Sequence, residues 1–354
     1  MNHISKIAGK LEDYGLDAML VTSESGELYA LGFHGEGLLL ITKNGGHYST
    51  DGRYIEAARE KIAQVEVKCV GGEATHLSMA KEYIEANGLH NVGFESGAMT
   101  VDEHRHYAQE LPCILTPAQS LLDDLRAAKD EEEMEAMKKA QKITDDAFRA
   151  ILSFIRPGMT EREVAARLVY EMMRMGADKV SFDHIVAAGP NGSRPHAIPG
   201  DRVIEQGMFV TMDFGCKVDG YCSDMTRTVA VGHVTDEMRE IYNTVLQAQL
   251  AGLAASKAGV PGDAIDGAAR KVITDAGYGP YFGHGYGHSL GLEVHEAPSP
   301  NARNAEPMPL HSVASAEPGI YLPGKFGVRI EDCVVFTEDG YENLATSPKN
   351  LIIV

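Results

Sequence analysis

Short apolar runs alternate with amphipathic stretches over about the first 120 residues of the chain. Residues 18–22, 37–42, 65–70 and 91–94 are brief apolar or alternating segments, which is typical of strands in a buried sheet. Residues 54–62 and 74–86 instead carry apolar side chains at the spacing of one helix face. This alternation predicts a small α/β domain over residues 1–120.

A different pattern begins after a connecting segment at residues 121–129. Asp130 and Glu133 form a capping-box signature, which predicts the start of a helix. The apolar positions that then recur at helical spacing are Met134, Met137, Ala140, Ala147, Phe148, Ile151 and Ile155. We therefore expect a long helix, ending at the Arg156-Pro157-Gly158 segment, to open a second domain over residues 121–354.

This second part of the chain repeats itself. The stretch from Arg156 aligns with the stretch from Lys257 at an offset of 101, and each copy reads as a turn, a helix and a glycine stop. Further on, residues 211–215 match residues 315–319, which puts Asp213 in the place of Glu317. The repeat predicts an α+β domain made of two copies of one unit, related by a pseudo-twofold axis.

Both copies carry a pair of carboxylates. Asp213 and Asp224 lie in the first copy, Glu317 and Glu331 in the second, and His288 precedes the second pair in a glycine-rich run. Four carboxylates at one site would repel each other unless cations neutralised them. The set therefore suggests two divalent metal ions and not one.

The first pair can be placed from the turn that separates its two strands. Asp219-Gly220 is a strong signal for a two-residue hairpin turn, and counting back from it puts Gly215 opposite Asp224. Asp213 is two residues from Gly215, so it shares a face with Asp224 as a diagonal neighbour. The second turn is longer and its register cannot be counted, but Arg329 and Glu331 must share a face by the same period of two.

Oxygen ligands combined with one imidazole suit Mn, Co, Fe or Zn, and a metal pair can acidify a bridging water near neutral pH. His288 is the favoured nitrogen ligand, although a single histidine is more often a core or loop residue. Three further histidines favour a site: His284 and His295 close by in the sequence, and His196 in GPNGSRPHAIP. The glycines around His288 do not follow the spacing of a nucleotide-binding loop.

The charge balance narrows the possible partners. The formal net charge is −19, from 32 basic and 51 acidic residues, which argues against nucleic acid or an anionic membrane surface. The N-terminal sequence has no signal-peptide pattern, and the apolar runs are too short to span a bilayer. Five scattered cysteines without a CxxC pair disfavour a thiolate zinc site and a disulfide framework. A cytoplasmic protein is the expectation.

Four segments resemble a known family. GYCSDMTRT, HGYGHSLGLEVHE, EPGIYLP and GVRIEDCVVFTEDG are similar to signatures of the dinuclear metallopeptidases with the pita-bread fold. That family includes methionine aminopeptidases, Xaa-Pro aminopeptidases, Xaa-Pro dipeptidases (prolidases) and creatinase. The N-terminal α/β domain, with its TDGRY element, resembles the extra domain of the Xaa-Pro and creatinase branch, which methionine aminopeptidases lack. Creatinase itself has lost the ligand positions that are filled here.

The resemblance implies a role for each candidate ligand. Asp213 resembles a chelating ligand of one metal, while Asp224 and Glu331 resemble carboxylates that hold both metals, with Glu331 bridging. His288 and Glu317 resemble the remaining ligands of the second metal. Two divalent ions per subunit are thereby implied, with Mn or Co favoured and Zn or Fe possible.

The resemblance also implies which residues act on the substrate. Glu317 resembles the general acid/base of the family, and His196 and His295 resemble histidines that contact the substrate carbonyl and the tetrahedral intermediate. His284 resembles a histidine lining the site for the residue after the scissile bond. Arg329 resembles the arginine beside the metal carboxylates in the proline-specific branch.

The expected function is that of a metallo-exopeptidase that removes an N-terminal residue followed by proline, from Xaa-Pro dipeptides or longer peptides, through a metal-bridging hydroxide. One alternative is a broad aminopeptidase without proline preference. Another is a non-catalytic binding protein on the same fold. A peptide substrate and a homodimer are what the family resemblance implies about partners.

Overall fold

The computed structural model describes residues 2–354 and separates the chain into two compact units, residues 1–126 and 127–354. The last helix of the first unit, α6 (Gln119–Ala127), spans the segment where the sequence suggested only a connection, so that expectation was wrong. The apolar residues Leu121 and Leu122 are fully buried, which explains why a short amphipathic helix forms there. The domain boundary predicted between residues 120 and 121 lies within α6 and stays a prediction.

The first unit is built on a six-stranded sheet in the order β4-β3-β2-β1-β5-β6. Its strands are β1 (Ala18–Val21), β2 (Leu38–Thr42), β3 (Gly45–Thr50), β4 (Glu66–Cys69), β5 (Asn91–Phe94) and β6 (Ile114–Pro117). Its other helices are α1 (Ile4–Lys10), η1 (Glu12–Tyr14), α2 (Glu24–Leu31), α3 (Ile55–Lys61), α4 (His76–Asn87) and α5 (Val101–Glu110). The α/β class and all six elements predicted for this part are confirmed, with bounds shifted by at most two residues at either end.

The second unit carries the repeated part of the chain. Its helices are α7 (Glu131–Leu152), α8 (Glu161–Arg174), η2 (Gly189–Ser193), α9 (Asp236–Ala255), α10 (Gly262–Asp275) and η3 (Gly279–Tyr281). The strands of its first half are β7 (Lys179–Val180), β8 (Ile185–Ala188), β9 (Phe209–Phe214), β10 (Cys216–Val218), β11 (Tyr221–Cys222) and β12 (Met225–Ala230). Those of its second half are β13 (Val313–Ala316), β14 (Gly319–Leu322), β15 (Phe326–Arg329), β16 (Asp332–Phe336) and β17 (Tyr341–Asn343).

The capping box predicted at Asp130 and Glu133 begins α7, with both reciprocal hydrogen bonds formed. The helix stops at Leu152, four residues before the predicted Arg156-Pro157-Gly158 end, and Ile155 is buried in the turn that follows. A left-handed Gly158 then redirects the chain into α8.

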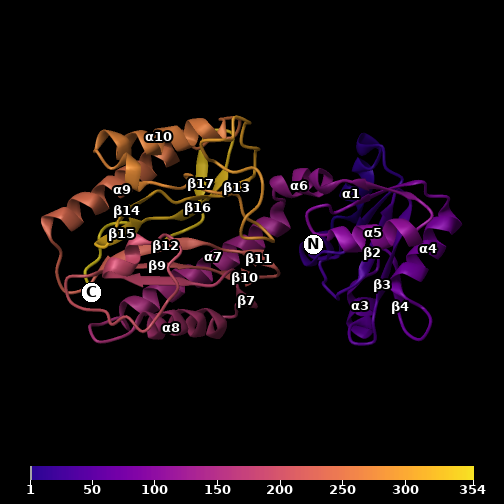
Figure 1. The fold of residues 1–354 in the computed structure, drawn as a ribbon, viewed down its shortest axis with the longest axis horizontal. Helices are drawn as coiled ribbons and strands as arrows, with labels where there is room; N and C mark the ends of the chain where they lie inside the picture. Colours follow the sequence, from indigo (N-terminus) through magenta and orange to yellow (C-terminus); the bar gives the residue numbers. More distant parts are fainter. Residues whose placement is uncertain (1) are drawn as a thin grey trace. The chain divides into compact units, whose positions relative to one another are not determined.

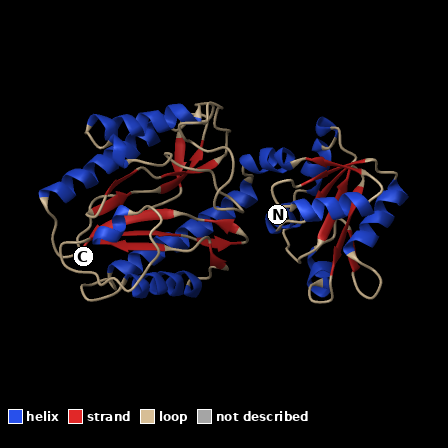
Figure 2. Cartoon of the chain, viewed as in Figure 1, coloured by secondary structure: helices blue, strands red, loops and turns tan. Residues whose placement is uncertain are grey.

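Each half of the second unit has a helix pair, a group of strands and an apolar core of its own. In the first half, α7 and α8 bury residues such as Phe148 and Leu168 against strands β8, β9, β10 and β12. In the second half, α9 and α10 bury residues such as Val245 and Ile265 against strands β13 to β16. Figures 1 and 2 show the strands of this unit lying between the α9–α10 pair and the α7–α8 pair. The duplicated α+β architecture expected from the repeat is confirmed.

The register of the first hairpin agrees with the count made from its turn. Val218 pairs with Tyr221 next to the turn, and Thr226 pairs with Asp213 at the far end, so Gly215 falls opposite Asp224. A Cβ atom on Gly215 would lie 1.9 Å from the carbonyl oxygen of Ser223, so only glycine allows this close approach.

The second hairpin turns through Pro323, Gly324 and Lys325, and the structure supplies the register that the sequence left open. Gly319 pairs with Arg329 on one side of a short gap in the ladder, and Ala316 pairs with Asp332 on the other side. The same register carried through the gap puts Glu317 opposite Glu331. The two acids of this half therefore face each other directly, whereas those of the first half are diagonal neighbours.

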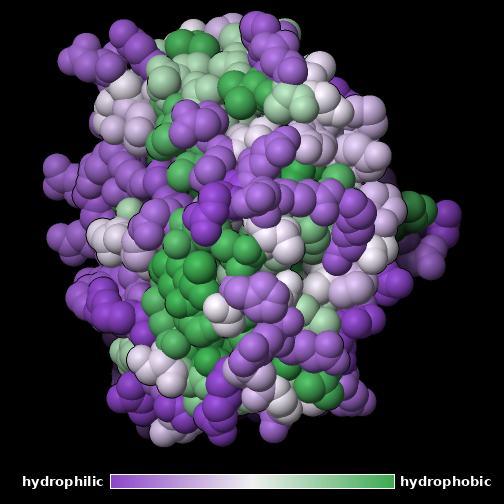
Figure 3. All heavy atoms as spheres, turned by 90° about the vertical axis from the view of Figure 1, so that its left-hand side faces the viewer, coloured by the Kyte–Doolittle hydropathy of each residue, from purple (hydrophilic) through white to green (hydrophobic). Residues whose placement is uncertain are grey.

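Polar side chains cover most of the face drawn in Figure 3, with hydrophobic residues gathered mainly in its lower half. None of the helices within residues 2–354 is both long and apolar enough to cross a bilayer.

Candidate metal centre

One cavity of about 960 Å³ in the second unit is lined by every residue that the sequence singled out. These are His196, Asp213, Asp224, His284, His288, His295, Glu317, Arg329 and Glu331. They come from segments more than 100 residues apart, since His196 and Glu331 belong to different halves of the repeat. Folding of the duplicated unit is what brings these side chains to a common cavity.

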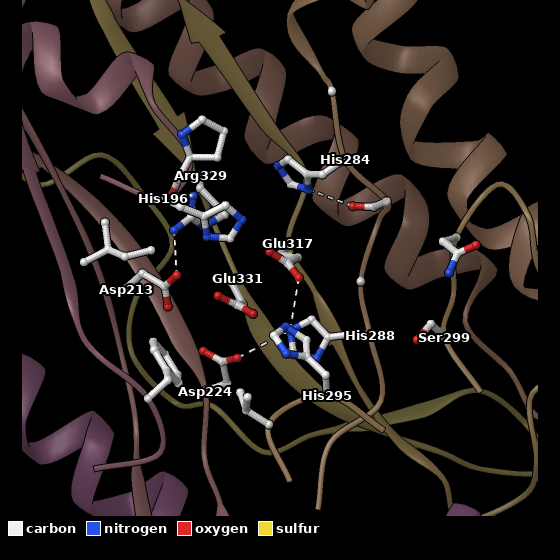
Figure 4. A pocket seen from close by; sticks show the side chains of 18 of the residues that line it. His196, Asp213, Asp224, His284, His288, His295, Ser299, Glu317, Arg329 and Glu331 are labelled. Carbon is white, nitrogen blue, oxygen red and sulfur yellow. Dashed lines mark hydrogen bonds and ion pairs between the residues drawn. The ribbon is translucent and has the colours of Figure 1, made fainter. Parts of the chain in front are cut away.

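Each of the two hairpins carries two of the four carboxylates. Asp213 lies on β9 and Asp224 directly precedes β12, while Glu317 and Glu331 lie in the gap between the two ladders of the second hairpin. Figure 4 shows the four side chains pointing toward one another.

Three of the candidate ligands form a compact group. One ligand atom from each of Asp224, His288 and Glu331 lies within 4.8 Å of the other two. The Nε2 atom of His288 is 3.5 Å from Asp224 Oδ2 and 3.3 Å from Glu317 Oε1. A single cation among these atoms could be shared by carboxylates of both halves.

Two buried oxygen atoms support a cation at this place. Asp213 Oδ1 and Asp224 Oδ1 are both inaccessible to solvent and have no hydrogen-bond partner among residues 2–354. A carboxylate oxygen can only accept, and leaving it buried without a partner is costly. Positive ions beside these two oxygens would satisfy both, so the residues present fit a divalent metal centre.

The electrostatics of the carboxylates agree with that fit. Burial, followed by repulsion from Glu331, raises the pKa of Asp224 well above its ordinary value. Burial, followed by repulsion from Glu317, likewise raises the pKa of Glu331. Without cations these acids would hold protons at pH values where exposed acids are ionised, because each one disfavours the charge of the next.

The surroundings of His288 would suit a neutral nitrogen ligand. Burial lowers its pKa, which favours the unprotonated ring that a metal requires. Its Nδ1 atom lies 3.2 Å from the carbonyl oxygen of Ser289, where it donates its proton. That hydrogen bond leaves Nε2 free of hydrogen on the side facing Asp224 and Glu317. The Oγ of Ser315 accepts from the His288 backbone N–H and donates to Glu317 Oε1.

Arg329 is buried behind the carboxylates and joins the two halves. Its Nη2 donates to Asp213 Oδ2 over 2.6 Å, and its Nε donates to the Thr226 hydroxyl over 2.9 Å. Its Nη1 donates to the Tyr321 hydroxyl over 2.8 Å. The pairing of Asp213 with Arg329 engages only Oδ2, so Oδ1 remains available to a cation.

The other three histidines surround this cluster at different places. His284 Nε2 lies 2.9 Å from the Tyr321 hydroxyl, and burial lowers the pKa of His284. The rings of His295 and His288 meet edge to face with 4.3 Å between their centroids. Figure 4 shows His295 beside His288, whereas His196 lies near Arg329 and Asp213. The histidines therefore border the cavity on both sides of the carboxylates.

Three residues around the cluster were missed in the sequence: Thr226, Ser315 and Tyr321. Two of them carried a usable signal, because Thr226 is two residues from Asp224 and Ser315 is two residues from Glu317. Residues two apart on a strand share a face, so both hydroxyls could have been placed beside their acids. Tyr321 had no such relation to His284, which it reaches only through the fold.

The comparisons with known proteins assign the family. Residues 135–338 match the description "Metallopeptidase family M24", and residues 3–128 match "Creatinase/Prolidase N-terminal domain". The chain belongs to metallopeptidase family M24 and has the pita-bread catalytic domain with the smaller N-terminal domain expected from the sequence. It is a metallo-exopeptidase.

Individual relatives cover nearly the whole chain. An uncharacterized peptidase, YqhT, of Bacillus subtilis is 41% identical over 99% of both chains. The solved Xaa-Pro dipeptidase from Bacillus anthracis is 40% identical, covers 99% of both chains and superposes with a TM-score of 0.95. The solved X-Pro aminopeptidase from Thermotoga maritima is 36% identical over 100% of both chains, with a TM-score of 0.93.

Proposed function

We propose that this metallo-exopeptidase removes the N-terminal residue from peptides in which proline is the second residue, with two divalent metals in the cavity. The observation that carries the proposal is the convergence of four carboxylates and His288 on one cavity, with two buried carboxylate oxygens that lack partners. The preference for proline is supported by the neighbours, which are an Xaa-Pro dipeptidase and an X-Pro aminopeptidase by name.

Asp213 would hold one metal, Asp224 and Glu331 would hold both, and His288 and Glu317 would complete the second. When bound, the metals supply Lewis acidity, which activates water at neutral pH and polarises the scissile carbonyl. Mn or Co is the favoured ion, and Zn or Fe also suits this donor set. The carboxylates of the chain would determine where in the cavity the positive charge of the metals lies.

Glu317 is the proposed proton carrier. Burial raises the pKa of Glu317, and the electrostatic interactions with His284 and with Arg329 partly offset this rise. A carboxyl group poised in this way can accept a proton from the attacking water and return it to the leaving nitrogen. The Ser315 hydroxyl, 3.0 Å from Glu317 Oε1, holds the group in place.

His196 and His295 are the proposed donors to the negative charge that develops on the carbonyl oxygen. Burial, followed by repulsion from His288, lowers the pKa of His295, so a neutral ring would donate N–H. His284 would line the site for the residue after the scissile bond, with its ring held by Tyr321. Arg329 would keep Asp213 in its chelating orientation.

A panel of peptides tests the proposal. Turnover of Xaa-Pro dipeptides, longer Xaa-Pro peptides and matched Xaa-Ala peptides would be measured with Mn, Co, Zn or Fe added to chelator-treated enzyme. We expect hydrolysis of Xaa-Pro substrates to exceed that of Xaa-Ala substrates. Equal rates would establish a broad aminopeptidase, and no tightly held metal together with no turnover would establish a binding protein.

A homodimer and a cytoplasmic location are also proposals, since they come from the family resemblance and from the composition. Sedimentation of the purified protein tests the first, and fractionation of the source cells tests the second. A monomer in sedimentation would contradict the proposed assembly without affecting the assignment of the ligands.

A further inference from the structure

We infer that Glu161 is a positioning residue for the reaction, because its buried carboxylate holds the loop that presents His196 to the cavity. Glu161 is the first residue of α8, and its side chain is fully buried. It lies outside the set that lines the cavity. The inference rests on the proposed role of His196.

The carboxylate of Glu161 binds both ends of that loop. Its Oε1 accepts from the backbone N–H of Ala188 over 2.7 Å, at the end of β8. Its Oε2 accepts from the backbone N–H of Gly200 over 3.1 Å. The Nδ2 of Asn191 donates to both oxygens at 3.0 Å. One side chain therefore fixes the start, an early turn and the end of the segment from 188 to 200.

A carboxylate suits this place better than any uncharged side chain. Both of its oxygens accept, whereas an amide would turn an N–H₂ group toward either Ala188 or Gly200. A buried negative charge is costly unless it is hydrogen-bonded, and charged acceptors make the stronger hydrogen bonds. The N-terminal turn of α8 also favours negative charge. Thr160 and Glu163 supply the capping box of that helix, which leaves Glu161 for the loop.

The loop needs such a support because it reaches into the cavity. His196 and Ile198 both line the cavity and both are exposed, with Ile198 at 87%. No hydrogen bond or ion pair holds the His196 ring itself among residues 2–354, so the backbone of the loop determines which part of the cavity the ring can reach. Besides the bonds to Glu161, Arg329 Nη1 donates to the carbonyl oxygen of Pro195 over 3.3 Å.

In the second half of the repeat, a different residue holds the loop that carries a cavity histidine. The position that corresponds to Glu161 at the offset of 101 is Gly262, which has no side chain to offer. Asp266, one turn further along α10, instead accepts from the backbone N–H of Tyr286 over 2.9 Å and from Arg270 over 2.7 Å. Arg270 in turn donates to the carbonyl oxygen of His284 over 2.7 Å. In both halves, a buried helix carboxylate thus holds a loop that carries a cavity histidine.

The substitution Glu161→Gln in the metal-loaded enzyme tests the inference. We expect kcat to fall on the order of 10- to 100-fold, as a displacement of about 1 Å of a positioned group does, with metal content unchanged. Amide hydrogen exchange at Ala188 and Gly200 should become faster. Glu171→Gln is the matched control, because Glu171 is a buried carboxylate of the same helix that pairs with Arg167 and Arg174. It should keep kcat and the exchange rates of the loop.

A double-mutant cycle with His196→Ala separates this inference from the proposed function. If Glu161 acts through His196, adding Glu161→Gln to the His196→Ala enzyme should lower kcat no further. An equal loss in both backgrounds, or unchanged loop exchange in Glu161→Gln, would overturn the inference. Full activity of His196→Ala would instead refute the proposed role of that histidine, and with it the catalytic part of the inference.

Asn191→Ala keeps the experiment decisive if the Glu161→Gln enzyme does not fold. This variant removes only the side-chain donor and leaves the carboxylate with its two backbone partners. We expect a smaller decrease in kcat, of the same kind, with faster exchange at Gly200. Wild-type kcat together with wild-type exchange in this variant would count against the inference.

Discussion

The hydroxyl of Thr226 donates to Glu331 Oε2 over 2.6 Å, so a residue of the first hairpin orients a carboxylate of the second. The same hydroxyl accepts from Arg329 Nε over 2.9 Å. Thr226 therefore sets the direction of Glu331 and the position of the guanidinium that pairs with Asp213. Replacing a group that orients a metal ligand typically costs about 10- to 100-fold in metal affinity or activity.

Thr226→Val should weaken metal binding by about 10- to 100-fold, because the isosteric side chain leaves Glu331 without its donor. Calorimetric titration of the metal-free variant with Mn²⁺ measures the effect. Thr211→Val is the control, since Thr211 is a buried threonine of the neighbouring strand that bonds to Thr228 and to a backbone carbonyl. A metal affinity equal to that of the control would contradict the orienting role of Thr226.

Asp224→Asn and Glu331→Gln should each lower kcat by more than the roughly 10- to 100-fold expected when a residue that only orients a ligand is replaced. Both changes keep the size of the side chain and remove the charge that offsets the metal. The bound metal per chain, measured by elemental analysis, should fall together with activity. Near-normal turnover in either variant would overturn the assignment of these two carboxylates.

Gly215→Ala should lower the free energy of unfolding by about 1–3 kcal/mol, because the new Cβ would meet the backbone of Ser223 directly before Asp224. Denaturant unfolding of the metal-free protein measures this change. Gly267→Ala makes a matched comparison, since no atom lies within 4 Å of its added Cβ in the middle of α10. That substitution should stabilise the protein by about 0.5–1 kcal/mol.

The sequence predicted the parts of the site that depend on local geometry. The Asp219-Gly220 turn determined the register of the first hairpin, and a strand period of two then put Asp213 and Asp224 on one face. The repeat indicated that a second pair of acids would belong to the same centre. All nine candidate residues line one cavity, although their individual roles remain proposals.

The parts that the sequence did not predict depend on contacts between distant segments. The gap in the ladder of the second hairpin puts Glu317 opposite Glu331, and no turn signal allowed that register to be counted. Tyr321 reaches His284 only because the β14–β15 hairpin meets a segment more than 30 residues earlier in the chain, and it reaches Arg329 across that hairpin, whose register could not be counted. Helix α6 was read as a connection because nine residues offer too few turns for a clear period.

His47 makes the first unit sensitive to acid. Its side chain is fully buried on β3, stacked on Tyr83, and neither ring nitrogen has a hydrogen-bond partner among residues 2–354. Burial, followed by the charge of Lys68, lowers the pKa of His47 below its ordinary value of 6.5. As the pH falls below 6.5, the unfolded chain therefore binds a proton at His47 before the folded unit does.

The free energy of unfolding should consequently fall as the pH drops below about 6.5, by up to about 1.4 kcal/mol per pH unit, until the folded pKa is reached. His47→Leu should remove the part of this dependence that comes from His47 and stabilise the first unit at every pH. Denaturant unfolding at several pH values, followed through amide exchange of β3, measures the difference. Burial also lowers the pKa of His76 in this unit, so His47→Leu should reduce the acid sensitivity and not abolish it. The exposed His106→Leu serves as the control, and an acid sensitivity in His47→Leu equal to that of this control would refute the explanation.

The four carboxylates of the cavity are divided equally between the two copies of the repeat. Asp213 and Asp224 come from one copy of the repeat, and Glu317 and Glu331 come from the other, so neither copy alone supplies the complete cluster. A half-length ancestor could have built this centre only by pairing two identical chains around it. The two copies also differ in detail, because Glu161 and Asp266 hold loops that carry a cavity histidine from different helix positions.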